Sequence, residues 1–108
     1  MIRLKAESVH KDSRRTFTQL FTANIKQVNC TEANHGAILG NHFHKDTIEY
    51  FYITRGVLLY NNKEIIRRGD MFVIKPTERH TLKVMSDKAT FLTFLTEPYN
   101  HDNPDLHK

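Results

Sequence analysis

The feature that most constrains the fold of this chain is a series of short apolar runs separated at close intervals by turn-forming residues. Each run is rich in β-branched and aromatic residues, which favour strands, and asparagine, glycine, proline or serine punctuate the intervals. The 3.6-residue apolar periodicity of an amphipathic helix is never sustained over ten residues. Many short strands at this spacing predict an all-β sandwich or barrel. The predicted strands are Phe17–Phe21, Ile25–Cys30, Ala37–Phe43, Ile48–Thr54, Val57–Tyr60, Lys63–Ile66, Met71–Ile74, Thr81–Met85 and Phe91–Thr96.

With 108 residues, the chain is long enough for one domain with a real core and too short for two. We expect a polar N-terminal arm or edge strand over residues 1–15 and the barrel over 16–98. A polar C-terminal tail, expected to be frayed, occupies 99–108. We expect its histidines, His101 and His107, to be solvated rather than to bind a ligand.

The charge of the chain does not indicate a nucleic-acid-binding protein. The net charge is +4 and the isoelectric point is near 9.3. The basic residues are scattered, however, and no helix-turn-helix or zinc-finger pattern surrounds them, so we expect no nucleic-acid partner. They could instead attract an anionic substrate such as a phosphate or a sugar nucleotide.

Nothing in the sequence indicates a membrane or secreted protein. No apolar run is long enough to span a membrane, and the N-terminus lacks the apolar segment of a signal peptide. The single cysteine, Cys30, cannot form an intramolecular disulfide, which fits a reducing compartment. We therefore expect a cytoplasmic protein in which Cys30 is a small core residue.

Three histidines and a glutamate have the spacing of a metal site. His42 and His44 flank one residue, so on an extended strand both imidazoles point to the same face, with Cα atoms about 6.5–7 Å apart. Glu49 would arrive from the next strand and His80 from a distant one. Three nitrogen ligands and one oxygen ligand suit Zn, Fe, Ni, Mn or Cu, and the set does not distinguish among them.

Strand alternation supports an inward direction for these four side chains. Each candidate ligand extends an inward apolar row, as expected for a site that lines a barrel interior. An inward carboxylate among apolar neighbours needs a partner or a metal. The same alternation places Phe43, Tyr50 and Tyr52 on the outer face, where a second layer or a dimer partner would cover them. The inward rows are Phe51 and Ile53 after Glu49, and Leu82 and Val84 after His80.

The segment that contains the His-x-His pair resembles the first motif of the cupin superfamily, a group of small jelly-roll β-barrels. That motif is G-x5-H-x-H-x3–4-E-x6-G. This chain matches it at every spacing, with Gly36, His42, His44, Glu49 and Gly56. The resemblance implies a single-domain cupin jelly roll, also described as a double-stranded β-helix.

The second cupin motif, G-x5-P-x-G-x2-H-x3-N, is matched more loosely. Gly69 and His80 keep the family separation of eleven positions. Pro76 is displaced by one position, Glu78 stands where glycine is usual, and Val84 replaces the final asparagine. These departures concern the turn before His80 and leave the four metal-ligand positions intact.

A narrower resemblance links this chain to cupins of nucleotide-sugar metabolism. These include relatives of dTDP-4-dehydrorhamnose 3,5-epimerase, sugar ketoisomerases and the cupin domains of capsular-polysaccharide enzymes. Several epimerases of this group use no metal and work with a histidine base and a tyrosine acid. This chain retains all four metal-ligand positions, as the capsular-polysaccharide cupin domains do. The residues that carry this resemblance are Asp12, Arg14, Phe17, Leu20, Gln27, Val28, Asn29, Gly40, Asn41, His42, His44 and Lys45.

The cupin resemblance implies a divalent transition metal (Zn, Fe, Ni or Mn) on His42, His44, Glu49 and His80. It also implies a small-molecule ligand and a homodimer, which in some small cupins exchanges N-terminal strands. Three functions remain open. The first is binding or isomerising a sugar or sugar nucleotide, with the ion as Lewis acid and a separate general base. The second is an Fe(II)-dependent dioxygenase, and the third is binding of a small ligand without catalysis. Tyr60 and Lys45 are available as bases.

Overall fold

The computed structural model describes all residues from Met1 to Lys108 and contains eleven strands and no helix. The strands are β1 (Ile2–Arg3), β2 (Ser8–Lys11), β3 (Thr16–Gln19), β4 (Gln27–Asn34), β5 (Ile38–His42), β6 (Glu49–Arg55), β7 (Val57–Tyr60), β8 (Glu64–Arg67), β9 (Met71–Ile74), β10 (His80–Val84) and β11 (Lys88–Leu95).

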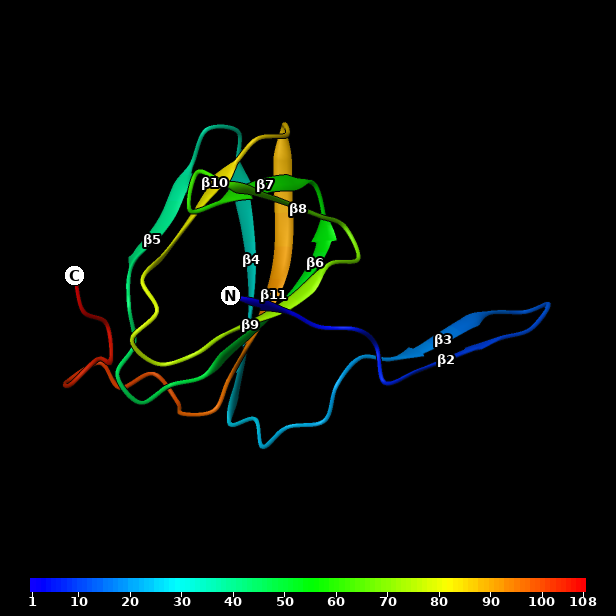
Figure 1. The fold of residues 1–108 in the computed structure, drawn as a ribbon, viewed down its shortest axis with the longest axis horizontal. Coiled ribbons are helices and arrows are strands. Elements are labelled where there is room, and N and C mark those ends of the chain that lie inside the picture. The colour runs from blue at the N-terminus through cyan, green and yellow to red at the C-terminus, as the bar shows by residue number, and fades with distance from the viewer.

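Nine of the eleven strands form two antiparallel sheets that enclose one interior (Figure 1). The larger sheet has the order β1-β9-β6-β11-β4, and the smaller has the order β5-β10-β7-β8. Neighbours within a sheet are mostly distant in sequence, because the chain passes repeatedly from one sheet to the other. The predicted all-β jelly roll is confirmed. None of the chain is folded into a long apolar helix of the kind that crosses a membrane.

The core lies between the two sheets, where period-2 alternation places the apolar side chains. Phe51 and Ile53 on β6 and Leu82 and Val84 on β10 are all buried, which confirms the predicted inward rows. Phe51 stacks on Phe72 of β9 with ring centroids 4.7 Å apart. The outward-facing alternates on β6 and β10 are partly buried or exposed. Burial of one face of each sheet is the main apolar stabilisation of the barrel.

Each of the nine predicted runs overlaps a strand, and the largest difference is in β4. The sequence predicted a strand over Ile25–Cys30, whereas β4 spans Gln27–Asn34. The eight residues of β4 pair one to one with β11, from Lys88↔Asn34 to Leu95↔Gln27. Pairing with a long neighbour therefore extends β4 through the polar residues after Cys30, which carry little strand signal of their own.

The N-terminal segment adds an edge strand and a projecting hairpin. β1 pairs with β9 at the edge of the larger sheet. β2 and β3 pair only with each other, and Figure 1 shows this hairpin extending away from the body. Asp12 stabilises its turn by accepting hydrogen bonds from the backbone N–H groups of Arg14 and Arg15. The boundary expected after residue 15 lies within this hairpin, because β3 pairs with β2 and not with either sheet of the barrel.

The chain after the hairpin returns across the outer face of the larger sheet. Phe21 stacks on Tyr50 at a centroid distance of 4.6 Å and meets the edge of Phe94 at 5.1 Å. Part of the cover that the outward Tyr50 requires is thus supplied by the chain itself. Cys30 on β4 is exposed, so the prediction that it is a core residue was wrong. Cys30 lies on the edge strand β4 and points outward, whereas its neighbours Asn29 and Thr31 point to the cavity.

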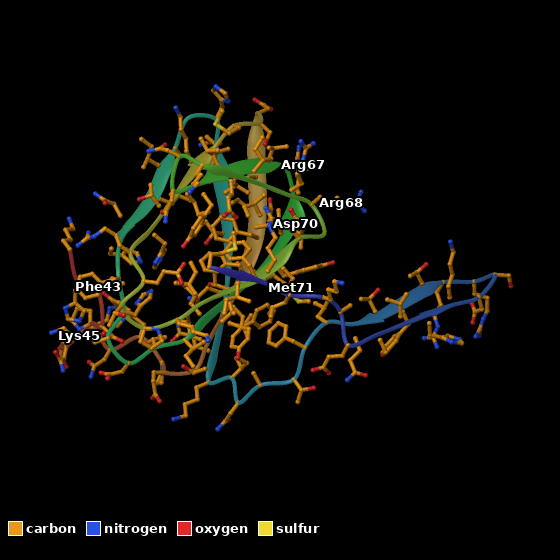
Figure 2. The ribbon with its side chains drawn as sticks, in the orientation of Figure 1. Phe43, Lys45, Arg67, Arg68, Asp70 and Met71 are labelled. Carbon is orange, nitrogen blue, oxygen red and sulfur yellow. The ribbon has the colours of Figure 1, made fainter.

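The C-terminal tail folds back against the loop after β5, contrary to the expectation that it is frayed. Figure 2 shows Phe43 and Lys45 at the end of the molecule that the tail reaches, with Arg67 and Arg68 on the opposite side of the body. Phe43 and His107 exchange two backbone hydrogen bonds. The tail therefore continues the wall of the barrel beyond the end of β5.

Candidate metal centre

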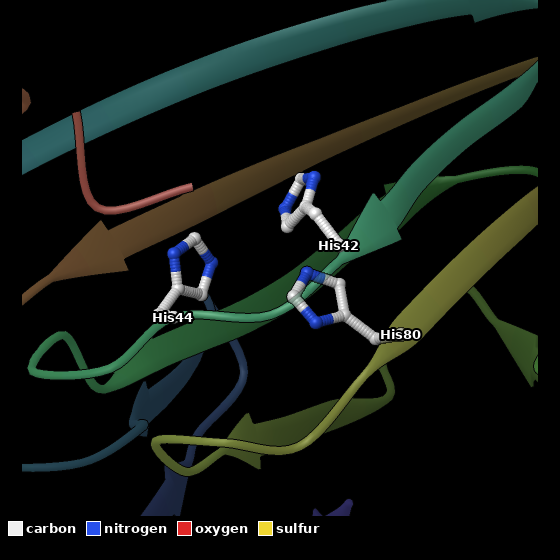
Figure 3. Close-up of side chains that lie close together, drawn as sticks. All are labelled: His42, His44 and His80. Atoms are coloured by element: carbon white, nitrogen blue, oxygen red, sulfur yellow. The ribbon is translucent and has the colours of Figure 1, made fainter. Parts of the chain in front are cut away.

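The first two candidate ligands lie at the end of β5 and just beyond it. β5 ends at His42, and His44 lies in the following loop rather than on the strand (Figure 3). Gly40 and Asn41 have positive φ angles of 86° and 62°, which twist the end of β5 before His42. Glycine and asparagine tolerate this left-handed region better than other residues do. The two histidines thus reach one site from a strand end and a loop.

His80 begins β10 directly opposite His42, since the two residues are partners in the β5–β10 pair. The register shifts between His80 and Thr81, where a bulge adjoins Gly40. A Cβ atom on Gly40 would lie 2.9 Å from the His80 carbonyl oxygen, closer than real Cβ contacts allow. The close approach of these two backbones therefore requires glycine at position 40.

The structure brings His42, His44 and His80 together in one cluster. One ring nitrogen from each lies within 4.8 Å of those of the other two. The ring centroids are 5.0 Å apart for His42–His44, 4.5 Å for His42–His80 and 5.3 Å for His44–His80. Figure 3 shows the three rings converging from β5, the loop after it and β10. His44 and His80 are buried, and His42 is partly exposed.

Glu49 approaches the cluster from the first residue of β6. Its Oε1 atom lies 3.2 Å from His44 Nε2 and 3.6 Å from His80 Nε2. The Glu49 side chain is 13% exposed, so the carboxylate is largely withdrawn from water. A carboxylate at this depth requires the partners that the two imidazoles provide.

The protonation of the three histidines differs with their surroundings. Burial, together with the neighbouring charges of His80 and His44, lowers the pKa of His42 to about 4. Burial also lowers the pKa of His80. For His44, burial acts in the same direction, but hydrogen bonds to Glu49 and to the Asp105 carbonyl outweigh it and raise its pKa. His42 and His80 are thus neutral at pH 7 and have the protonation state that metal ligation needs.

Backbone carbonyls orient two of the three rings. His44 Nδ1 donates to the Asp105 carbonyl at 2.7 Å, and His80 Nδ1 donates to the Glu78 carbonyl at 3.2 Å. In both residues this leaves Nε2 directed at the side where Glu49 Oε1 lies. Metal-ligating histidines typically have their second nitrogen held in this way. Three imidazole nitrogens and one carboxylate oxygen therefore fit a divalent transition metal.

The turn before His80 is ordered despite its departures from the family pattern. Thr77 adopts a positive φ of 70°, and its N–H donates to the His44 carbonyl. The Glu78 carboxylate accepts a hydrogen bond from the Tyr60 hydroxyl. Val84, which replaces the family asparagine, is fully buried in the core. A backbone hydrogen bond of Thr77 and the side-chain hydrogen bond of Glu78 thus hold the turn that leads to His80.

A cavity of about 250 Å³ between the two sheets adjoins the cluster. Its polar lining includes Asn29, Thr31 and Thr93, which the sequence analysis did not single out as cavity residues. Asn29 and Thr31 share the inward face of β4 with the buried Ala33, whereas the apolar Val28 and Cys30 of this strand are exposed, so hydropathic alternation alone predicts the wrong face. The complete lining is Asn29, Thr31, Leu39, Gly40, His42, Glu49, Phe51, His80, Leu82, Phe91 and Thr93.

A second hollow of about 410 Å³ lies on the outer side of the cluster. It shares Asn29, His42 and Glu49 with the inner cavity, and the C-terminal tail forms one wall. His101, which was expected to be merely solvated, lines this hollow. Neither hollow is lined by lysine or arginine. The complete lining is Gln27, Asn29, His42, His44, Glu49, Leu95, Tyr99, His101 and Leu106.

The two residues considered as general bases lie away from the inner cavity. Tyr60 points to Glu78, and burial with this hydrogen bond raises the pKa of Tyr60, so its hydroxyl stays protonated. Lys45 is exposed on the outside of the loop after β5 (Figure 2). Asp12 and Phe17, which contribute to the narrower resemblance, lie on the projecting hairpin rather than at the cavity.

Comparison with known proteins identifies the family. The family model described as "Cupin domain" matches residues 31–96, more than half of the chain, and this match includes all four candidate ligands. The chain is a cupin. No curated protein sequence matches this cupin.

Solved structures share its fold at low sequence identity. The capsular polysaccharide assembling protein CapF from Staphylococcus aureus is 23% identical, with a TM-score of 0.65 over 93% of this cupin and 33% of CapF. The dTDP-6-deoxy-D-glucose-3,5-epimerase RmlC from Legionella pneumophila, solved with dTDP-4-keto-L-rhamnose, is 17% identical. Its TM-score is 0.72 over 89% of this chain and 66% of RmlC. NovW, a 4-keto-6-deoxy sugar epimerase from Streptomyces spheroides, is 17% identical, with a TM-score of 0.71 over 94% and 70% of the two chains.

These similarities establish the fold of this cupin. The chain spans about one third of the length of CapF and about two thirds of that of RmlC. The shared part is the barrel whose opening holds the histidine cluster.

Proposed function

We propose that this cupin binds a divalent transition metal through His42, His44, His80 and Glu49 and presents it to a small molecule in the adjoining cavity. The observation that carries the proposal is the convergence of three imidazoles within 4.8 Å, with the Glu49 carboxylate against two of them. Carbonyl contacts to Nδ1 of His44 and His80 support it, because they direct Nε2 of both rings to a common centre. Zn, Fe, Ni and Mn all suit this donor set.

The lining of the cavity indicates the chemical class of the small molecule. Asn29, Thr31 and Thr93 offer uncharged hydrogen-bonding groups, while Phe51 and Phe91 contribute apolar surface. This combination suits a neutral ligand with hydroxyl or carbonyl groups on one side and an apolar face on the other, such as a sugar. A bound metal would polarise one of those oxygens.

A free sugar or similar neutral molecule fits this site better than a sugar nucleotide. The pyrophosphate of a sugar nucleotide is an anion that proteins hold with cations or clustered N–H groups. Neither hollow beside the cluster is lined by lysine or arginine, and Glu49 lines both. The scattered positive charge of the chain therefore does not converge on the site.

Binding without turnover is the second candidate function. The titratable side chains that line the inner cavity are His42, Glu49 and His80, all proposed metal ligands. A base for proton abstraction needs to lie within hydrogen-bond reach of the substrate and remain free of the metal. The inner cavity supplies no such group, which favours a binding protein over an isomerase.

Metal analysis tests the proposal directly. The protein would be purified without oxygen, its metal content measured, and the metal-free form titrated with Zn²⁺, Mn²⁺, Ni²⁺ and Fe²⁺. We expect one ion per chain, loss of binding in His42→Ala and His80→Ala, and weaker binding in Glu49→Gln. His10→Ala is the matched control, because His10 lies on the projecting hairpin. Iron in the purified protein would favour the alternative function, an Fe(II)-dependent dioxygenase. A protein that binds none of the four ions would overturn the proposal.

A further inference from the structure

Asp105 in the C-terminal tail holds the loop that carries His44. Its carboxylate accepts hydrogen bonds from the backbone N–H groups of Lys45 at 2.8 Å and of Asp46 and Thr47 at 2.9 Å each. It also accepts from the Thr47 hydroxyl at 2.9 Å. Four donors on three consecutive residues leave this short loop little freedom to change its path.

The same residue contacts the His44 ring through its backbone. The Asp105 carbonyl accepts the hydrogen of His44 Nδ1 at 2.7 Å. With its Nδ1–H held by this carbonyl, the His44 ring directs Nε2 at Glu49 Oε1, which lies 3.2 Å away and accepts a hydrogen bond from Nε2 where no metal is bound. One tail residue thus sets both the position of the loop and the orientation of the ring.

The dependence on the tail is specific to His44. His80 is oriented by the carbonyl of Glu78, two residues earlier on its own turn. His42 is the last residue of β5 and is held by pairing with β10. His44 lies beyond that strand, and its Nδ1 partner is 61 residues away in sequence. Removing the tail contact therefore releases one of the three histidines and leaves the other two in place.

We propose that Asp105 is a positioning residue of the metal centre, which makes the C-terminal tail a functional part of the site. Its carboxylate fixes the loop and its carbonyl holds Nδ1–H of His44, so that Nε2 is the atom directed at the metal. This inference rests on the proposed metal-binding function. Partners that orient a metal-bound histidine typically contribute about 10–100-fold to metal affinity.

The test combines a spectroscopic measurement on the metal-free protein with a metal titration. Long-range ¹H–¹⁵N correlation at about pH 8.5, well above the ordinary histidine pKa of about 6.5, reports which nitrogens of each ring carry a hydrogen. We expect Nδ1 of His44 to carry a hydrogen in the wild type, held by the Asp105 carbonyl, and the form with hydrogen on Nε2 alone, which donates to Glu49, to gain population in Asp105→Ala. Titration with Zn²⁺ should show about 10–100-fold weaker binding in Asp105→Ala. Asp105→Asn, which keeps one acceptor oxygen, should fall between the two.

Asp102→Ala is the matched control, because Asp102 lies in the same tail and its carboxylate accepts no hydrogen bond. It should leave the tautomer and the Zn²⁺ affinity unchanged. An unchanged His44 tautomer and unchanged affinity in folded Asp105→Ala, or in Asp105→Asn if the alanine variant does not fold, would overturn the inference. Failure of the wild type to bind metal would overturn the proposed function instead, and the tautomer of His44 would still show whether Asp105 orients it.

Discussion

His42 and His80 are direct partners across the antiparallel β5–β10 pair, and their rings meet edge to face with centroids 4.5 Å apart. Two candidate ligands are therefore placed by the register of one strand pair. Antiparallel partners of this kind have Cβ atoms about 4.5–5.5 Å apart, which lets both rings reach one ion. Any change that alters this register moves both ligands together.

Gly40→Ala should disturb that register. Gly40 has a φ of 86°, and an added Cβ would lie 2.9 Å from the His80 carbonyl oxygen. Gly36→Ala is the matched control, because Gly36 has a similar φ of 82° and open space around it. We expect a loss of about 1–2 kcal/mol in the free energy of unfolding for Gly36→Ala, from the left-handed backbone alone. Gly40→Ala should lose about 1–3 kcal/mol more.

Urea denaturation of the two variants measures these losses, and Zn²⁺ titration measures the effect on the site. Gly40→Ala should weaken metal binding, whereas Gly36→Ala should not. Equal losses of stability in the two variants would show that the contact with His80 is relieved at no cost.

Tyr60→Phe should lower stability without affecting the metal site. The buried Tyr60 hydroxyl donates to the Glu78 carboxylate, and a hydrogen bond to a charged group contributes about 1.5–3 kcal/mol. Thermal or urea denaturation should show a loss in this range. Tyr52→Phe, on the outer face of β6, should be close to neutral. Abolished ligand turnover with normal metal content in Tyr60→Phe would reinstate Tyr60 as a general base.

The hydrogen bonds of Asp105 should make part of the stability dependent on pH. Burial opposes ionisation, but the N–H groups of Lys45 and Asp46 outweigh it and hold the pKa of Asp105 well below its ordinary value. The unfolded pKa is about 3.9. The contribution is therefore complete above that pH and is lost as the pH falls from about 4 towards the folded pKa.

The comparison of wild type with Asp105→Asn isolates this effect from the other carboxyl groups. Urea denaturation at about pH 6 should show the wild type more stable by about 1–3 kcal/mol. The difference should shrink as the pH is lowered below about 4. A difference that stays constant between these pH values would contradict an ionised Asp105 as the acceptor.

We expect a homodimer in solution, because an isolated two-stranded hairpin is marginal in water. The β2–β3 hairpin pairs with nothing else in the chain, and its Phe17 is 50% exposed. Sedimentation equilibrium should give twice the mass of the chain, and Phe17→Asp should weaken the association. Ile65→Asp is the control, since Ile65 on β8 is 49% exposed. A monomeric wild type would contradict the expectation.

Most of the strands, and the inward faces of β6 and β10, could be predicted from sequence because both depend on neighbouring residues. Period-2 alternation along β6 places Glu49 beside Phe51 on the interior face, and the asparagine pair at Asn61 and Asn62 adopts the positive φ that a tight turn needs. These choices require no knowledge of distant parts of the chain. The extent of β4 was harder to predict, since its polar second half is a strand through pairing with β11.

The candidate site likewise has residues that could be predicted from local spacing and a residue whose position depends on a distant part of the chain. The spacing of His42, His44 and Glu49 predicted three side chains on a common face, and the structure brings all three together with His80. The strand model was nevertheless incomplete, because His44 lies in a loop. Its position depends on Asp105, whose place in a short polar tail carries no local signal.

By itself, the sequence determined that this chain is an all-β cupin, and it predicted that three histidines and a glutamate line the interior of the barrel. The alternation of side chains and the spacing of residues depend only on neighbouring residues, so they are the same whatever the strand packs against. The tertiary structure alone decided which groups surround the four side chains. It placed Asn29 and Thr93 in the cavity, left the cavity without cations, and set the Asp105 carbonyl against His44 Nδ1. Those contacts join residues far apart in the chain, so only folding brings them within hydrogen-bond distance.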